Sequence, residues 1–151
     1  MLFRRVRAEF SDGVIDLLPL RLYPPEKEMG FGHVYDYMIV PHGTHREVGR
    51  ISLRMGESPC VYYFGHIGYH VDPPYRGNHY ARRACALLRP LIALHGKSSV
   101  VITTDPDNWA SRKTCLGLGC TLERTVAVPQ EIRDRWEISA VKCRYIWRID
   151  G

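Results

Sequence analysis

Alternating apolar and polar positions in the first half of the chain predict a series of short strands. These segments are β-prone and are separated by turn residues; they are 14–22, 33–40, 47–55 and 61–71. Pro19 places the first segment at the edge of a sheet, because proline cannot donate to a β-ladder. The other three follow one another through short turns, so we expect an antiparallel meander.

The second half of the chain changes to the period of a helix. Apolar residues recur three and four positions apart over residues 77–95, which predicts a helix with one apolar face. Pro90 lies inside this helix and should kink or split it. The wholly apolar segment 99–103 predicts a buried strand, and residues 109–118 predict a second helix. Two further segments are β-prone, 121–128 and 143–149. Residues 129–137 between them predict a charged loop or a short helix.

Together these elements predict one α/β domain in the 151 residues. Strand 61–71, helix 77–95 and strand 99–103 form a β-α-β unit. Ligands of open α/β sheets bind beyond the carboxyl ends of such strands. The turns at 76–81 and 105–111 both follow strand ends, so we expect them to line one cleft.

The turn at 71–81 predicts a site for an anion. Two prolines end the strand, and a helix then starts near Gly77. The first N–H groups of a helix have no partner inside it, and the helix dipole favours negative charge there. Arg76 adds a formal positive charge beside them, so the turn suits a phosphate. The alternative is an ordinary strand–loop–helix connection, since glycine-containing turns are common.

Composition narrows the class of protein. The net charge of +5 favours acidic cofactors and substrates, but the 21 basic residues are spread along the chain without a basic arm. Binding to nucleic acid, as in a ribosome-associated protein, needs a contiguous basic face and is not expected. The five cysteines are odd in number and lack a CxxC pair, which is typical of reduced thiols in a cytoplasmic protein without a zinc site. No apolar stretch approaches the roughly 20 residues that span a bilayer, so no membrane partner is expected.

Two motifs resemble those of the GNAT superfamily of acyl-CoA-dependent N-acetyltransferases. The first, similar to the family's cofactor turn, is Val71-Asp72-Pro73 followed by Arg76-Gly77-Asn78-His79-Tyr80-Ala81. The second, one helix and one strand later as in the family, is Asn108-Trp109-Ala110-Ser111 followed by Leu118-Gly119-Cys120. The resemblance covers about residues 34–128 and looks most like the branch of ribosomal-protein and alanine N-terminal acetyltransferases. It implies a mixed, mostly antiparallel sheet with a splayed strand and flanking helices.

The resemblance also implies acetyl-CoA as the cofactor, together with the residues that hold it. Backbone amides of the turn would bind the pyrophosphate; they belong to Arg76, Gly77, Asn78, His79, Tyr80 and Ala81. The backbone of Val71 would face the thioester, and Asn108 and Ser111 would contact the pantetheine arm or the phosphates. The alternative for Asn108 and Ser111 is a capping pair at the start of helix 109–118. His79 departs from the family, which prefers a small glycine at this position.

Catalysis in this family implies direct attack of a neutral amine on the thioester, with removal of the amine's proton and protonation of the thiolate. His66 is the candidate base, because it stands near the family's glutamate and shares a face of the predicted strand with His70. The alternative for His66 is a satisfied polar residue of the sheet. Cys115 stands where many members carry the tyrosine that protonates the thiolate, so it is either the acid or a packing residue.

The acceptor stays open between a small amine, an antibiotic and a protein N-terminus. A non-catalytic acyl-CoA-binding or regulatory module is the alternative function, because the family's glutamate and tyrosine are missing. A homodimer through pairing of the exposed strands 14–22 or 143–149 is a further expectation.

Overall fold

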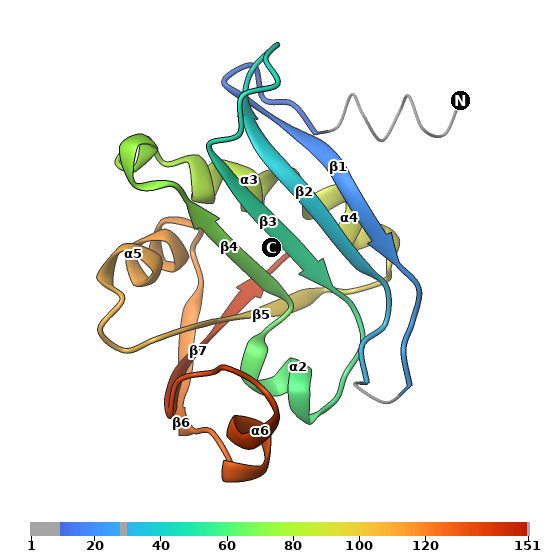
Figure 1. Cartoon of the computed structure of the whole chain (residues 1–151), viewed down its shortest axis with the longest axis vertical. Helices are drawn as coiled ribbons and strands as arrows, with labels where there is room; N and C mark the ends of the chain where they lie inside the picture. Colours follow the sequence, from blue (N-terminus) through green and yellow to red (C-terminus); the bar gives the residue numbers. More distant parts are fainter. Residues whose placement is uncertain (1–9, 28–29, 151) are drawn as a thin grey trace.

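The computed structural model describes residues 10–27 and 30–150. They form one seven-stranded sheet with the strand order β1-β2-β3-β4-β5-β7-β6 (Figure 1). The strands are β1 Ile15–Tyr23, β2 Val34–Pro41, β3 Gly49–Arg54, β4 Ile67–Val71, β5 Ser99–Thr104, β6 Thr121–Ala127 and β7 Val141–Arg148. The helices are α2 Pro59–Phe64, α3 Tyr80–Leu87, α4 Arg89–Leu94, α5 Trp109–Gly117 and α6 Gln130–Arg135, with a 3-10 turn η1 at Pro73–Tyr75.

Neighbouring strands of this sheet are antiparallel with one exception. β4 and β5 run parallel and pair only between Ile67 and Ile102, so they diverge beyond this point. The sheet is therefore mixed and mostly antiparallel, with one splayed pair, which confirms the predicted fold class. The divergence leaves an opening in the sheet between the carboxyl ends of β4 and β5.

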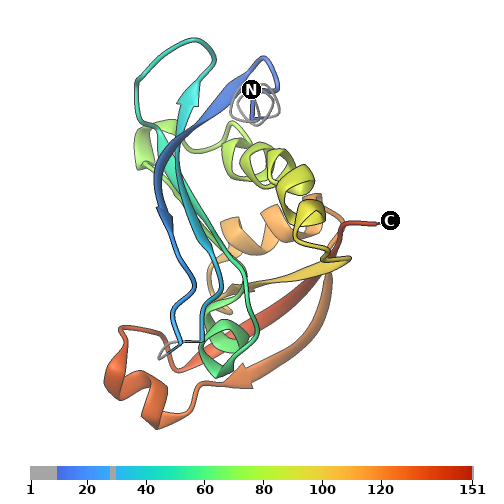
Figure 2. The same ribbon diagram turned by 90° about the vertical axis from the view of Figure 1, so that its right-hand side faces the viewer.

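Helices α3, α4 and α5 lie on one face of the sheet (Figure 2). The core lies between these helices and the strands, where Ile51 and Leu53 of β3 are at most 1% exposed. Burial of each such side chain stabilises the fold by about 1.5–3 kcal/mol. The buried residues of β3 alternate with Arg50, Ser52 and Arg54, which therefore point to the opposite face. That face carries polar side chains close to the splayed pair.

The prediction of one long strand over residues 61–71, interrupted by Gly65 and Gly68, is wrong. Residues Pro59–Phe64 form α2, and β4 begins only at Ile67. Ser58 caps α2 by accepting a hydrogen bond from the Val61 N–H (3.2 Å), and Pro59 fits the first turn of a helix. The aromatic run behind this start is typical of a strand, but the Ser-Pro start signal is the stronger indicator here.

Two other expectations concern the ends of elements. The helix predicted over 77–95 is split at Leu88 into α3 and α4, which confirms the effect expected of Pro90. The segment 143–149 is not an exposed edge, because β7 pairs with β5 on one side and with β6 on the other. The edges of the sheet are β1, as predicted, and β6. None of the described helices has the length and apolar character needed to cross a membrane.

Candidate functional site

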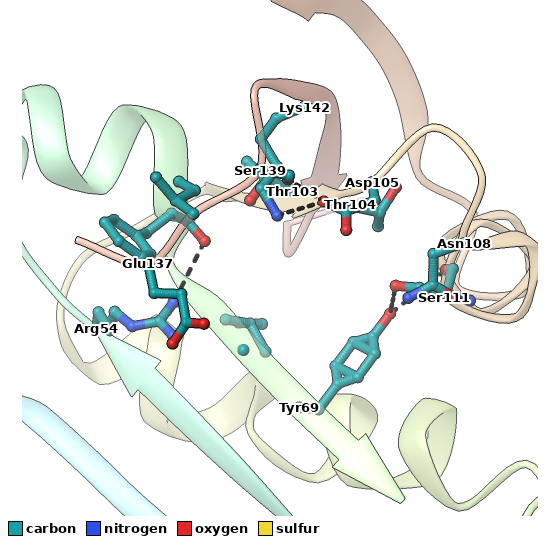
Figure 3. Close-up of a pocket in the computed structure, with 14 residues that line it drawn as sticks. Arg54, Tyr69, Thr103, Thr104, Asp105, Asn108, Ser111, Glu137, Ser139 and Lys142 are labelled. Atoms are coloured by element: carbon teal, nitrogen blue, oxygen red, sulfur yellow. Dashed lines mark hydrogen bonds and ion pairs between the residues drawn. The ribbon is translucent and has the colours of Figure 1, made fainter. Parts of the chain in front are cut away.

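The opening between β4 and β5 contains a cavity of about 340 Å³ (Figure 3). Gly68 and Tyr69 of β4 form one wall, and Thr103 and Thr104 of β5 form the other. The turn that enters α5 also lines this cavity, whereas residues 76–81 do not. We expected the turns at 76–81 and 105–111 to line one cleft. Residues of the turn at 105–111 line this cavity, whereas the turn at 76–81 follows the end of β4 and does not line it.

The start of α5 brings two predicted residues to the cavity. Asn108 caps the helix, and its Oδ1 accepts a hydrogen bond from the Ser111 N–H (3.1 Å). The Ser111 hydroxyl forms a 2.8 Å hydrogen bond with the Tyr69 hydroxyl across the cavity. The capping interpretation of Asn108 is confirmed, and contact of Asn108 and Ser111 with a cofactor stays a prediction.

The turn at 71–81 presents a row of backbone N–H groups without an acceptor. Within the described part of the chain, the N–H groups of residues 77–82 donate to no other residue, whereas those of Arg76 and Arg83 are bonded. Gly77 (φ 89°) and His79 (φ 60°) shape this stretch with left-handed backbone conformations. Because the N–H groups stand at the start of α3, the helix dipole adds a positive potential there. This geometry has the features expected of an anion site.

Arg76 and Val71 form a contact that the sequence did not predict. The Arg76 Nε donates to the Val71 carbonyl at 2.8 Å, which places the guanidinium at the end of β4. A ligand that binds the Val71 carbonyl would share this acceptor with Arg76 or displace it. The roles expected of these two residues toward thioester and phosphate therefore stay predictions.

Thr104 carries a buried hydroxyl that lacks a partner within residues 10–27 and 30–150. The residue is 3% exposed and lines the cavity, yet its Oγ1 forms no hydrogen bond there. A buried, unsatisfied hydroxyl costs about 1–3 kcal/mol, and a polar ligand atom in the cavity would remove this cost. Thr104 suits the amides of the pantetheine arm of acetyl-CoA, and the unpaired amides of the turn suit its phosphates. Sequence reasoning missed it because threonine is an ordinary strand residue.

His66 lies outside the cavity and is 4% exposed. Its Nδ1 accepts a hydrogen bond from the Val101 N–H (2.9 Å), and its Nε2 lies 2.9 Å from Glu57 Oε1. Burial lowers the pKa of His66, so the ring is neutral at pH 7 with both nitrogens engaged. The prediction that His66 shares a strand face with His70 is wrong, because β4 begins only at Ile67, and His66 is buried whereas His70 is exposed. Its role as the base stays a prediction that this geometry does not support.

Cys115 lies in the core with no exposed surface and does not line the cavity. A hydrogen bond with the Cys120 thiol and burial raise the pKa of Cys115. Tyr69 stands between Cys115 and the cavity, and burial raises the pKa of Tyr69 as well. Its hydroxyl is therefore protonated at neutral pH and reaches the site that the Cys115 thiol does not. The signal in the sequence was the position of Tyr69 two residues after the buried Ile67, on the same face of β4.

Known proteins share this fold. Residues 18–121 match the acetyltransferase (GNAT) domain. The ribosomal-protein-S5-alanine acetyltransferase of Vibrio fischeri is 20% identical with a TM-score of 0.60, over 78% of this chain and 63% of that chain. RimL, a ribosomal L7/L12 alpha-N-protein acetyltransferase solved with coenzyme A, is 21% identical with a TM-score of 0.58, over 82% of this chain and 65% of that chain. The microcin C7 self-immunity acetyltransferase MccE, solved with acetyl-CoA and AMP, is 20% identical with a TM-score of 0.57, over 76% of this chain and 61% of that chain.

The similar structures show the fold of this chain, whereas the domain match shows its family. No curated protein matches the sequence. The chain spans less than two thirds of the length of the three structures above, and their low identity shows the fold alone. The domain match covers more than half of the chain and confirms the resemblance of the two motifs. The chain therefore belongs to the GNAT acetyltransferase domain family.

Proposed function

We propose that the protein is an acetyl-CoA-dependent N-acetyltransferase that moves the acetyl group directly to an amine. The observation that carries this proposal is the opening of the sheet between β4 and β5. Thr104, whose hydroxyl has no partner among the described residues, lines this opening, and a helix start follows β4 with amides that are likewise unpaired within the described chain. Membership of the acetyltransferase family favours the same reaction.

Different residues of the chain suit the different parts of acetyl-CoA. The N–H groups of residues 77–82 suit the pyrophosphate, because a helix start is an anion site. Thr104, Asn108 and Ser111 suit the amides of the pantetheine arm, since all three line the cavity. When bound, acetyl-CoA supplies a thioester carbon that bonds to the amine nitrogen as the carbon–sulfur bond breaks.

Tyr69 is the residue that we assign as the acid. Its hydroxyl lies at the cavity, so it can give its proton to the departing sulfur. The 2.8 Å hydrogen bond with Ser111 holds this hydroxyl at the cavity wall. In this chain Tyr69, from β4, would supply the proton that Cys115, on α5, is too deeply buried to deliver.

Glu137 is the residue that we assign as the base. An acceptor amine must lose a proton before it can attack a thioester. Two carboxylates line the cavity, and one of them, Asp105, is held by Lys142 (2.7 Å) and by the Ser139 hydroxyl. Glu137 forms no ion pair with another described residue and is exposed, so a water molecule can carry the proton between it and the amine.

A non-catalytic acyl-CoA-binding module is the second candidate function. The observation that favours it is the burial of both residues predicted to perform the chemistry, His66 and Cys115. The two functions differ in turnover. We expect release of the coenzyme A thiol from acetyl-CoA when the protein meets a panel of small amines and N-terminal peptides. Binding of acetyl-CoA without thiol release across the whole panel would favour the module.

A further inference from the structure

A second cavity, of about 450 Å³, borders the polar face of the sheet opposite α3, α4 and α5. Asp36 of β2 and Ser52 of β3 line it, as does His70 of β4. Arg54, Gly68 and Tyr69 line both this cavity and the one between β4 and β5. These three residues therefore border both cavities beside the splayed pair. A molecule in the second cavity would lie against the same three residues, on the face opposite the helices.

Arg54 stands at this meeting point in a fixed orientation. Its Nη1 donates to the carbonyls of Phe64 (3.3 Å) and Gly65 (3.1 Å) at the end of α2. Its Nη2 lies over Gly68, where an added Cβ would come within 2.4 Å of that nitrogen. The missing side chain at Gly68 thus leaves room for the guanidinium. The orientation of Arg54 is set before any ligand arrives.

The charge of Arg54 lacks a counterion among the described residues. Of the other cations that line the two cavities, Arg50 pairs with Glu47 (2.5 Å) and Lys142 pairs with Asp105 (2.7 Å). No carboxylate within the described ranges lies within 4.0 Å of the Arg54 guanidinium, and its Nε and Nη2 donate to no described residue. Burial lowers the pKa of Arg54, so an anion beside it would offset the cost of its charge.

Two carboxylates that line these neighbouring cavities form no ion pair with a described residue. Asp36 accepts a hydrogen bond from the Ser52 hydroxyl and lies in the second cavity, where its field favours the charged form of Arg54. Glu137 lies in the first cavity. Among the described residues, the two neighbouring cavities thus present one unpaired cation and two unpaired carboxylates. This pattern complements a molecule that carries both an amine and an anion.

We propose that the acceptor is an amine with a carboxylate a few bonds from the reacting nitrogen, and that Arg54 binds this carboxylate. The inference rests on the proposed function and names the substrate class of that site. A guanidinium offers two parallel N–H donors to a carboxylate, and its Nε and Nη2 are the pair left open here. Free amino acids and peptides with an acidic first residue both have this chemistry.

Matched acceptors test the proposal. Amino acids are compared with their amides, and peptides beginning with Asp or Glu with those beginning with Asn or Gln, by thiol release from acetyl-CoA. We expect a 10- to 150-fold higher kcat/KM for the acidic member of the preferred pair, as for a hydrogen bond to a charged group. Whichever pair shows the preference identifies the source of the carboxylate.

Three variants assign the preference to Arg54. Arg54→Gln removes the charge, so the acidic member should lose its advantage, mainly through KM. Arg54→Lys should keep part of it. Arg148→Gln removes an exposed cation that pairs with Asp150 and lines neither cavity, so it should keep all of it. Thermal unfolding shows which variants are folded.

Two outcomes would overturn the inference: equal use of acidic and neutral acceptors by the unaltered protein, or a full preference in folded Arg54→Gln. Calorimetric binding of the same acceptors in the presence of coenzyme A repeats the comparison without turnover. If no acceptor is acetylated, the proposed function fails. The binding ratio between acidic and neutral members still decides the role of Arg54.

Discussion

Two polar sites, one at each end of β4, differ in whether the protein satisfies their hydrogen bonds. The first cluster consists of His66, Glu57 and Lys97; the second is centred on Thr104. Before β4, the ring nitrogens of His66 are bonded to Val101 and Glu57, and Lys97 completes the cluster with a 2.6 Å contact to Glu57. At the divergence of β4 and β5, Thr104 has no partner within the described part of the chain. A buried polar group that the protein itself satisfies needs no further partner, whereas one left unsatisfied needs a water molecule, an ion or a ligand to complete it. The second cluster, not the first, is therefore the better candidate for chemistry.

The largest effect is expected for Tyr69→Phe. Removing the hydroxyl removes the proposed acid, and general acid catalysis contributes about 10²- to 10⁴-fold. We expect kcat to fall by this amount, with the variant still folded because the ring stays in the core. Cys115→Ala is the rival variant and should keep kcat within about threefold once folding is confirmed. A Tyr69→Phe protein with unchanged kcat, or a Cys115→Ala protein with a hundredfold loss, would reverse the assignment.

His66→Ala tests the satisfied cluster, and here the effect should appear in stability. The change leaves the Val101 N–H without its acceptor, so we expect the free energy of unfolding to fall by about 1–3 kcal/mol. Urea unfolding measures this loss, and the exposed His70→Ala should stay within about 0.5 kcal/mol. A loss of kcat/KM in His66→Ala that leaves stability unchanged would contradict the comparison and restore His66 as a catalytic residue.

The pH dependence of stability sharpens the same test. Burial lowers the pKa of His66 in the folded state below its ordinary value of 6.5, so the unfolded chain binds the proton more readily. The stability that His66 contributes is therefore present above about pH 6.5 and is lost as the pH falls through the folded pKa. Unfolding measured at steps below pH 7 should show this loss in the unaltered protein. His66→Ala should show a shallower loss, because alanine carries no group that takes up a proton at this position.

The sequence alone did not predict the difference between the His66 cluster and the Thr104 site, for a physical reason. Periodicity and proline placement predicted the sheet, the split of the long helix at Pro90 and the cap at Asn108, because these follow from local backbone chemistry. His66 was misassigned because its partners, Val101 and Glu57, depend on where α2 ends, and the Ser58-Pro59 start of α2 was overlooked. Pairings between distant segments decide which polar atoms are satisfied, and a single sequence does not show them.

The same reason explains why two residues of the site were missed. Tyr69 was one of several tyrosines in an aromatic segment, and its importance depends on Ser111, 42 positions later. Thr104 is significant only because nothing in the described chain bonds to it. The turn at 71–81 was recognisable because its unpaired amides follow from the backbone alone.

Thr104→Val tests the unsatisfied cluster with two effects of opposite sign. The variant keeps the shape of the side chain and removes a buried hydroxyl without a partner, so the free protein should gain about 1 kcal/mol of stability. Affinity for coenzyme A should fall by about two- to tenfold, because a hydrogen bond to the ligand is lost. Urea unfolding and calorimetric binding measure the two quantities. Lower stability of the free protein would show that the hydroxyl is already satisfied and would remove the contrast with His66.

The smallest effect is expected for His79→Gly, in the turn that leads from β4 to α3. His79 is the non-glycine residue with a positive φ (60°) among those described, and a left-handed backbone costs an ordinary residue about 1–2 kcal/mol. Glycine relieves this strain but gives the unfolded chain more freedom, so the net gain in stability should be about 0.5–1 kcal/mol. Gly77→Ala is the matched control: an added Cβ meets no atom within 4 Å, yet φ is 89°, so the strain alone should lower stability.

Coenzyme A should bind His79→Gly with nearly unchanged Kd, because the backbone N–H remains. A tenfold weaker Kd would show that the imidazole itself contacts the cofactor, and the turn would then bind through a side chain as well as through its amides.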